Sequence, residues 1–446
     1  NGGGGAADTG GGGTGGAAPV LELFVDCAAG SDAAAGSAMS PFKTLKHALS
    51  IATSGQTVWL APHAYHSTSG EDWSVPVPAG VTVAGIVSGE EQPQLVGPYD
   101  DTAAALVFEG DGSARDLIVE GFWGGVQADS GAQTLERLTL RDNQFAIVAA
   151  GTAVLSATAL EVSKRGGFFG DDVASLAIDG ANIHDLPVAC DGPEVVDFNA
   201  SSTFSLKNAV LETTGPVVLS DAASGSFADV QVVAVGQPCD SKASFRVEDA
   251  ASLSLVDVDI SDGPGTAVDS PQVGSVTLVG GTIDIPADAT AIESSGSLAV
   301  TDTVMMSSAA VSWECGIATM VAADLQAVTL QGFRRGLCVS TGTAKVRGTT
   351  FETGTGVMLY NGTVDLGQPG EGGGNDLGGV KECGLHIANS AAGFTIAAAG
   401  NLWIPGAQGA TGGVYPAGKV IAGPYGSADP WPKNVLIQFL GPKVQF

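Results

Sequence analysis

The sequence predicts an all-β fold, a right-handed parallel β-helix solenoid with an N-terminal capping helix and a C-terminal cap. Three observations predict it. A unit of similar length repeats along most of the chain, apolar residues alternate within each unit, and long runs at helical spacing are missing. The repeat sets the whole architecture.

The repeat is clearest between about Ala114 and Asp365. Each unit holds a short apolar run, a turn and a second run of small and aliphatic residues, such as Gly336-Leu337-Cys338-Val339. The last apolar residues of the first runs define ten steps that average about 23 residues, within the range of known repeat architectures. These residues are Val119, Leu140, Val162, Ile183, Leu211, Val232, Ile260, Ile283, Met305, Leu330 and Phe351.

Alternation within the units favours strands. Leu253-Ser254-Leu255 and Ala344-Lys345-Val346 place apolar residues two apart, which is the period of a β-strand. We expect roughly 12–15 coils, in which residues at the same position of successive coils stack about 4.8 Å apart. The longest steps, Ile183 to Leu211 and Val232 to Ile260, predict loops, which in solenoids often gather on one binding face.

The N-terminal end predicts a linker followed by a cap. Residues 1–19 are nearly all Gly, Ala, Thr and Asp, a composition typical of flexible segments. The segment from Phe42 to Thr53 has apolar residues at helical spacing, and Ser40-Pro41 before it suits an N-cap followed by Pro at the first helical position. This helix would cover the open end of the solenoid, whose unpaired edges otherwise template aggregation.

The remaining elements follow in order. Strands are expected at Gln56–Leu60, Val81–Ile86 and Ala104–Phe108, with a polar loop from His63 to Trp73. The β-helix is expected to extend over residues 20–404. Its later part contains a Gly-rich turn from Gly367 to Gly379 and further strands between Phe394 and Ile404. The tail, residues 405–446, is rich in Pro and aromatic residues and is expected to close the far end, with a strand at Val435–Leu440; a partner-binding tail is the alternative.

The N-terminal end also carries a family resemblance. Its strings are Leu23-Phe24-Val25-Asp26, Gly30-Ser31-Asp32, Pro41-Phe42-Lys43-Thr44-Leu45, His47-Ala48-Leu49 and Gln56-Thr57-Val58-Trp59-Leu60-Ala61-Pro62. The chain resembles the right-handed parallel β-helix proteins of the pectate-lyase-like superfamily. The resemblance covers most of Val20 to Asp365 and implies a first strand, a Gly-Ser-Asp turn, a short capping helix and a first rung. It is uninformative about substrate.

Charge limits the partners. The chain has 47 acidic and 18 basic residues and a net charge of −29. Nucleic acid is not an expected partner, because its binding needs Lys and Arg to replace counterions. A polyanionic glycan is disfavoured for the same reason unless a cation intervenes. No apolar stretch is long enough to predict a transmembrane span.

Six cysteines suit an oxidising compartment. None forms a Cys-x-x-Cys pair, so a structural zinc site is not expected. Their even number and wide spacing predict one to three disulfides, with Cys190–Cys239 as the first choice among 15 full connectivities, and buried thiols as the alternative. The six are Cys27, Cys190, Cys239, Cys315, Cys338 and Cys383.

The flexible linker and the cysteines together predict a location outside the cell. Mature bacterial lipoproteins often begin with such a Gly-rich tether behind a lipidated Cys. We therefore expect a protein that is secreted or tethered to the outer surface of a bacterial cell, with an N-terminal lipid anchor as a hypothesis. An ordinary disordered terminus is the alternative.

Stacking of the coils predicts two columns of charged residues. Two positions after the aligned apolar residues come Asp142, Lys164 and Asp185. One position after them come four further residues, which should form a neighbouring column. These are Glu120, Arg141, Ser163 and His184.

The same region predicts a carbohydrate site. Gly170-Asp171-Asp172 resembles the Gly-Asp-Asp of polygalacturonase-like β-helix hydrolases, and two carboxylates can perform glycoside hydrolysis. The resemblance implies catalysis by Asp171 and Asp172, and the stacked column adds Asp142 and Asp185 as further candidate catalytic carboxylates. The Gly-His-Gly, Asn-Thr-Asp and Arg-Ile-Lys motifs of those hydrolases are missing, and a ladder of surface ion pairs is the alternative. Expected binding residues are Trp123, Phe145, Lys164, Arg165, Phe168, Phe169 and His184.

Calcium is the other candidate ligand. Asp257, Asp259 and Asp262 surround one expected strand, and calcium prefers carboxylate oxygens, although no cofactor is required by the sequence. We expect first a non-enzymatic β-helix protein that binds a glycan or a surface protein, or acts as a scaffold. A polysaccharide hydrolase or lyase is the second hypothesis, and a subunit of a cell-surface fibre is the third.

Overall fold

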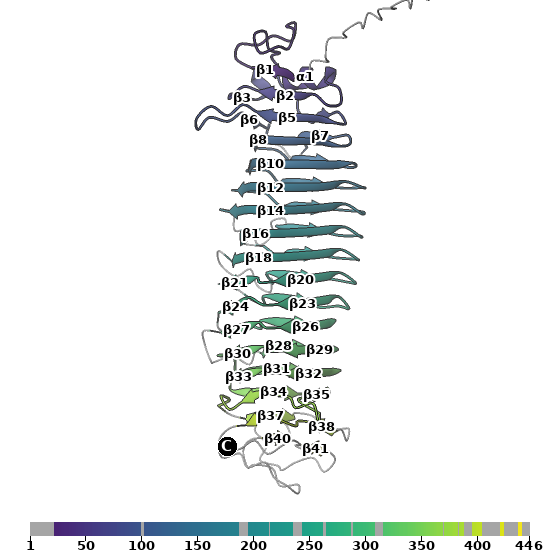
Figure 1. Ribbon diagram of the computed structural model, residues 1–446, viewed down its shortest axis with the longest axis vertical. Helices are drawn as coiled ribbons and strands as arrows, with labels where there is room; N and C mark the ends of the chain where they lie inside the picture. The colour runs from purple at the N-terminus through teal and green to yellow at the C-terminus, as the bar shows by residue number, and fades with distance from the viewer. Residues whose placement is uncertain are drawn as a thin grey trace, which may run out of the picture.

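The fold is a parallel β-solenoid of about 13 turns with almost no helix, as the sequence predicts. The computed structural model describes residues 22–99, 102–186, 195–213, 215–234, 243–261, 265–286, 289–307, 315–368, 370–381, 383–387, 395–403, 420–422 and 436–438. Figure 1 shows the strands stacked as coils along the long axis, with the helix α1 at the N-terminal end. None of the described helices is long and apolar enough to cross a membrane.

Each coil contributes one short strand to a sheet that we call sheet II. In the described residues it has 15 strands, paired in parallel. They are β4 (Val75–Val77), β7 (Ala104–Phe108), β9 (Gly124–Ala128), β11 (Phe145–Ala149), β13 (Phe168–Gly170), β15 (Val196–Phe198), β17 (Val217–Leu219), β19 (Phe245–Val247), β22 (Val268–Ser270), β25 (Ile292–Ser294), β28 (Cys315–Thr319), β31 (Arg335–Val339), β34 (Thr355–Leu359), β37 (Cys383–Ile387) and β40 (Val420–Ala422).

The rest of each coil belongs to a larger sheet, sheet I, with 26 strands in the described residues. Its first eleven are β1 (Glu22–Val25), β2 (Thr57–Leu60), β3 (Ala64–Tyr65), β5 (Val81–Gly85), β6 (Gln94–Val96), β8 (Gly112–Glu120), β10 (Ala132–Arg141), β12 (Val154–Ser163), β14 (Ser175–His184), β16 (Thr203–Thr213) and β18 (Ser224–Ala234). The later coils divide this part into two strands each. These are β20 (Ser252–Val256), β21 (Asp259–Ser261), β23 (Ser275–Val279), β24 (Thr282–Ile285), β26 (Ser297–Thr301), β27 (Val304–Ser307), β29 (Ala322–Gln326), β30 (Thr329–Gln331), β32 (Thr343–Arg347), β33 (Thr350–Glu352), β35 (Thr363–Asp365), β36 (Asp376–Leu377), β38 (Thr395–Ala397), β39 (Leu402–Trp403) and β41 (Leu436–Gln438).

The repeat that the sequence predicts is confirmed coil by coil. All eleven aligned apolar residues, from Val119 to Phe351, are register partners of one another in sheet I, and each is fully or almost fully buried. They form one continuous apolar column inside the solenoid. Each coil must fill its own interior position with one of its own side chains.

Sheet I bends at one left-handed residue in each of eleven consecutive coils, beginning at β8. In β10 this residue is Arg137, with φ of 51°, and it is aligned with Asp116 in the preceding coil and Ala159 in the following coil. Asp, Asn and Gly adopt this conformation most readily, and they fill most of the positions. The bend residues are Asp116, Arg137, Ala159, Gly180, Asn208, Asp229, Asp257, Gly280, Asp302, Ala327 and Gly348.

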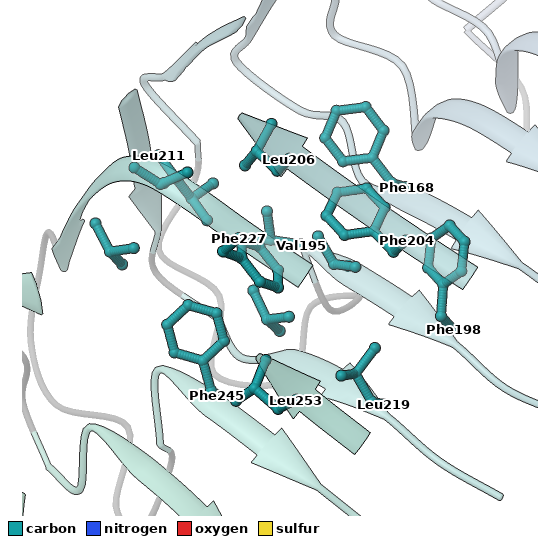
Figure 2. Packing of buried hydrophobic residues seen from close by; sticks show 14 of the residues in the cluster. Phe168, Val195, Phe198, Phe204, Leu206, Leu211, Leu219, Phe227, Phe245 and Leu253 are labelled. Atoms are coloured by element: carbon teal, nitrogen blue, oxygen red, sulfur yellow. The ribbon is translucent and has the colours of Figure 1, made fainter. Parts of the chain in front are cut away.

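Aromatic rings fill the interior of the middle coils. Figure 2 shows Phe204 between Phe198 and Phe168, with Phe227 and Phe245 continuing the stack. Ring centroids lie 5.0 Å apart for Phe198–Phe204, 5.5 Å for Phe204–Phe227 and 5.0 Å for Phe227–Phe245. These are ordinary separations for favourable aromatic pairs.

The capping helix is shorter than expected and begins later. It is α1 (Leu45–Ile51), and its N-cap is Thr44, whose side chain accepts a hydrogen bond from the His47 N–H. The expected cap at Ser40-Pro41 is wrong, because Phe42 instead pairs with Val25 and is buried in the core. The buried Glu71 accepts the N–H groups of Leu45 at 2.7 Å and Lys46 at 3.3 Å.

The other predicted segments agree in part. The strands expected near residues 56–60, 81–86 and 104–108 are β2, β5 and β7, and those near residues 394–404 and 435–440 appear as β38, β39 and β41. The loop expected from His63 to Trp73 instead contains β3 and a 3-10 helix, Ser67–Ser69, with Tyr65 fully buried. Tyr65 lies inside because its hydroxyl donates to the Val25 carbonyl at 2.9 Å.

One disulfide joins neighbouring strands of sheet II. Cys315 and Cys338 are bonded, with Cα atoms 6.0 Å apart. Cys27 is a free thiol that donates a weak hydrogen bond to the Ala64 carbonyl at 3.4 Å. The first-choice pairing, Cys190–Cys239, lies outside the described residues, as do residues 1–19.

Candidate functional site on the outer face of sheet II

From β9 to β25, the next-to-last residue of each sheet II strand lies on the outward face. In β13, β15 and β22 the flanking residues are buried and the central one is partly exposed, as strand alternation requires. Parallel register places these residues in one column. From β9 to β25 the column is Gln127, Val148, Phe169, Asp197, Val218, Arg246, Asp269 and Glu293.

An aromatic ladder occupies the N-terminal part of this face. It comprises Trp123, Phe145 and Phe169, which come from three consecutive coils and are each partly exposed. The ring centroids of Trp123 and Phe145 lie 5.6 Å apart, and those of Phe145 and Phe169 lie 5.8 Å apart. The sequence named all three as binding residues, and the structure brings them together.

Charged residues occupy the same column further along. The Arg246 Nε donates to Glu248 Oε1 at 2.7 Å, and Asp269 and Glu293 follow on the next two strands. Burial raises the pKa of the Asp269 carboxyl, the Arg246 charge opposes this shift, and Glu248 adds to it. These residues were missed by the sequence reasoning. Aligning the second run of each repeat would have found them, because Asp269 and Glu293 directly follow its aliphatic residues Val268 and Ile292.

The predicted column that begins with Glu120 lies at the edge where the chain enters sheet II. Register places Glu120, Arg141, Ser163 and His184 one above another, and Arg141 forms an ion pair with Glu120. His184 Nδ1 lies 3.0 Å from Asp185 Oδ2, and its Nε2 lies 3.5 Å from Glu161 Oε1. Burial lowers the pKa of His184, but these two carboxylates outweigh it and hold the pKa above its ordinary value.

The predicted column that begins with Asp142 consists of left-handed turn residues. Asp142, Lys164 and Asp185 have φ of 53°, 67° and 54°. Within this part of the described chain no ion pair joins Lys164 to either carboxylate. Lys164 and Arg165 are both exposed. The common backbone conformation, and not charge pairing, is what aligns these three residues.

The four expected catalytic carboxylates do not form one group. Asp142 and Asp185 lie before sheet II, whereas Asp171 and Asp172 follow β13 at its opposite edge, where the Asp171 Oδ1 accepts the Asp172 N–H at 2.7 Å. The edge before sheet II and the edge after it are separated by the three residues of β13, which span roughly 10 Å. Phe168 points into the core with 0% exposure and packs against Phe204, so its ring is not accessible to a ligand.

Two of the three expected calcium residues, Asp257 and Asp259, lie at the bend of sheet I. A groove of ≈ 480 Å³ is lined there by Asn208, Asp229, Gln231, Asp257 and Asp259, among others. Asp259 Oδ1 accepts the N–H and the hydroxyl of Thr282 at 2.9 and 2.6 Å. Asp262 lies outside the described residues. Among the described residues, no group of three or more His, Cys, Asp and Glu is placed to hold a metal ion.

Comparison with known families finds one match at the N-terminal end. A family model described as a protein of unknown function, DUF1565, matches residues 28–104. This segment runs from the first turn through α1 to the beginning of β7. A comparison with curated proteins found no match.

Several solved structures match the chain at low sequence identity. A tailspike protein 3 of bacteriophage CBA120 is 11% identical, with a TM-score of 0.38 over 77% of this chain and 58% of that chain. A GH136 lacto-N-biosidase from Eubacterium ramulus is 9% identical, with a TM-score of 0.32 over 86% and 68%. The A-module of the mannuronan C-5 epimerase AlgE6 from Azotobacter vinelandii is 12% identical, with a TM-score of 0.25 over 89% and 93%. The present chain thus spans little more than half of the tailspike chain, and likeness at this level concerns the fold alone.

Proposed function

We propose that this protein binds a glycan lengthwise along the outer face of sheet II, without chemically altering it. The observation that carries the proposal is the aromatic ladder of Trp123, Phe145 and Phe169. Binding sites for small organic groups combine aromatic surface with a few polar groups that fix orientation. The aromatic ladder supplies the aromatic surface, and the charged residues from Arg246 to Glu293 supply the polar groups on the same face.

The spacing of the ladder suits a polymer. Successive coils are about 4.8 Å apart, so a chain laid along the axis meets a new side chain at every rung. Aromatic rings offer flat apolar faces to the C–H faces of sugar rings, and the two partners lose little conformational freedom. The many acidic side chains favour a neutral or amine-bearing glycan over a polyuronate.

A glycan array probed with the intact chain tests this function. We expect binding to neutral or amine-bearing glycans. The Trp123→Ala and Phe145→Ala variants should each weaken it about three- to tenfold, the range that corresponds to one aromatic contact. The matched control is Trp59→Ala, because Trp59 lies on sheet I under Arg115, away from the ladder. An array without signal, with and without calcium, would reject the proposal; the calcium arm also tests the expected cation.

A second candidate function is glycoside hydrolysis on the same face. Asp269 and Glu293 are register partners on adjacent strands, and Asp269 has the raised pKa that a general acid needs. The test is release of reducing ends from glycans that bind on the array. Loss of turnover in Asp269→Asn with retention in Asp171→Ala favours this pair. The reverse pattern favours the carboxylates that the Gly-Asp-Asp resemblance implies, and no turnover by the unaltered protein rejects both.

We also propose that the protein works outside the cell, secreted or tethered to the surface of a bacterium. The Cys315–Cys338 disulfide supports this location, because disulfides persist in oxidising compartments. Mass spectrometry of the native protein tests the lipid anchor. An acylated residue ahead of the Gly-rich segment is expected, and an unmodified Asn1 at the N-terminus would reject the anchor.

A further inference from the structure

Tyr99 is an exposed aromatic residue held in a costly conformation. Its side chain is 61% exposed, and its φ of 57° lies in the left-handed region. That region is unfavourable for a bulky residue and is normally left to Gly, Asn or Asp. Strain of this kind persists only where the surrounding structure enforces it, and it gathers at binding sites.

The residue beneath Tyr99 is shaped to receive its ring. Tyr99 donates its N–H to the Gly121 carbonyl at 2.9 Å. A Cβ atom on Gly121 would lie 2.8 Å from two atoms of the Tyr99 ring, closer than real Cβ contacts allow. The ring therefore rests against the bare backbone of Gly121, and the rest of its surface faces solvent.

Charged groups lie near the ring, because Glu120 directly precedes Gly121 and is paired with Arg141. Burial raises the pKa of Tyr99, the Glu120 and Asp142 carboxylates raise it further, and Arg141 lowers it, so these three charged groups lie within electrostatic reach of the hydroxyl. Glu120 and Arg141 form a partly exposed ion pair, with side chains 16% and 30% exposed. The flat ring can pack against the C–H groups of a sugar. The charged donors and acceptors beside it can form hydrogen bonds with the sugar hydroxyls.

Tyr99 lies near the N-terminal end of the ladder, because its ring rests on Gly121, two residues before Trp123. It precedes β7, Trp123 precedes β9, Phe145 begins β11 and Phe169 lies in β13. Register pairs Ala104 with Gly124 and so sets Ala103 level with Trp123, which places Tyr99 in the turn before sheet II, at one side of the ladder. The sequence interpretation stopped at Trp123, because Tyr99 precedes the regular repeat.

We propose that Tyr99 is a further sugar-binding platform, which adds one pyranose subsite to the N-terminal end of the aromatic ladder. This inference rests on the proposed glycan binding. Glu120 and Arg141 act there as hydrogen-bonding partners of the sugar hydroxyls, and Gly121 acts as the seat that holds the ring in place.

A length series of oligosaccharides from a glycan that binds on the array tests the inference. Affinity for the longest oligomers should fall about three- to tenfold in Tyr99→Ala, whereas affinity for the shortest binding oligomers should not change. Trp123→Ala should weaken both, and Met39→Ala, an exposed change at the N-terminal end, should weaken neither. Equal affinities of Tyr99→Ala and the unaltered protein at every length overturn the subsite alone. Failure of every oligomer to bind the unaltered protein overturns the subsite together with the proposed function.

A second measurement separates binding from folding. Tyr99→Asn should raise the melting temperature, because Asn tolerates the left-handed conformation, while it weakens binding of the longest oligomers. Gly121→Ala should weaken the same binding only when Tyr99 is present, so the double variant with Tyr99→Ala should bind like Tyr99→Ala itself. Additive losses in that double-mutant cycle would contradict the role given to Gly121 as a seat.

Discussion

At the scale of single residues, backbone conformation shapes this solenoid as much as side-chain chemistry does. The bend of sheet I is made by one left-handed residue in each of eleven consecutive coils, and most of these coils use Asp, Asn or Gly there. The three exceptions are Arg137, Ala159 and Ala327, with φ of 51°, 53° and 54°. An L-residue in this conformation brings its Cβ too close to the following carbonyl oxygen, at a cost of roughly 1–2 kcal/mol.

Ala159→Gly should therefore stabilise the protein by about 1 kcal/mol, even though Gly loses more entropy on folding. Chemical denaturation followed by circular dichroism measures the change. Ala177→Gly is the matched control, because Ala177 is an exposed strand residue that is not among those with positive φ, and it should destabilise by about 0.5–1 kcal/mol. Equal effects of the two substitutions would contradict the role assigned to the bend.

A single carboxylate gives a defined pH dependence. Burial raises the pKa of Asp365, but hydrogen bonds from Arg347 and Gln368 outweigh this, so the pKa lies below its ordinary value. Arg347 Nη2 lies 2.9 Å from Asp365 Oδ2. A lowered pKa contributes stability that is present above the unfolded pKa of about 4 and is lost as pH falls through the folded value.

Asp365→Asn should consequently destabilise the protein near neutral pH, and its difference from the unaltered protein should shrink as pH falls from about 4 toward 2. Melting temperatures at several pH values measure this. Asp284→Asn, an exposed change in β24, should show little difference at any pH. A constant difference for Asp365→Asn across the range would show that the Arg347 contact does not depend on the charge.

At the scale of elements, each strand depends on the strands directly above and below it. β16 pairs with β14 and β18, and its inward residue Phe204 contacts rings from other coils, including Phe168 and Phe227. Because protein interiors are close-packed, no neighbour can move far enough to fill a missing ring.

Phe204→Ala should cost about 3–5 kcal/mol of unfolding free energy, the usual range for a buried aromatic residue. Hydrogen exchange should show the loss of protection concentrated in β14, β16 and β18. Thr203→Ala, an exposed change in the same strand, should stay within about 0.5 kcal/mol. Uniform loss of protection along the whole chain would mean that the coils unfold as one unit.

At the scale of the whole molecule, the solenoid is nearly one-dimensional. Every coil contacts chiefly its neighbours, so stability is approximately a sum of coil and interface contributions. The Cys315–Cys338 disulfide, which spans 23 residues, ties one coil to the next near the C-terminal end. Its effect should therefore be local.

Reduction of this disulfide, or the Cys315→Ser and Cys338→Ser pair of changes, should destabilise the surrounding coils by about 3 kcal/mol through the added chain entropy of the unfolded state. Hydrogen exchange should quicken in β28, β31 and β34 and stay unchanged in β8, β10 and β12. Cys27→Ser is the control, because it removes a cysteine that is not part of this disulfide. Equal quickening at both ends would contradict the nearest-neighbour description.

The repeat by itself determined the fold and much of the register. A strand that shifts by one residue turns its apolar side chains outward, so the alternation from Val119 to Phe351 permits one alignment of the coils. The same alignment placed Glu120 beside Arg141. Once the strand is known, alternation also separates the buried Phe168 from the partly exposed Phe169.

Only the tertiary structure decided which residues meet across turns of different length. Glu71 caps a helix that begins 26 residues earlier in the sequence. Tyr99 is positioned by Gly121 from the next coil. Local sequence patterns record burial and strand period, whereas such contacts depend on how each turn returns the chain to the stack, and turn length leaves no periodic signal.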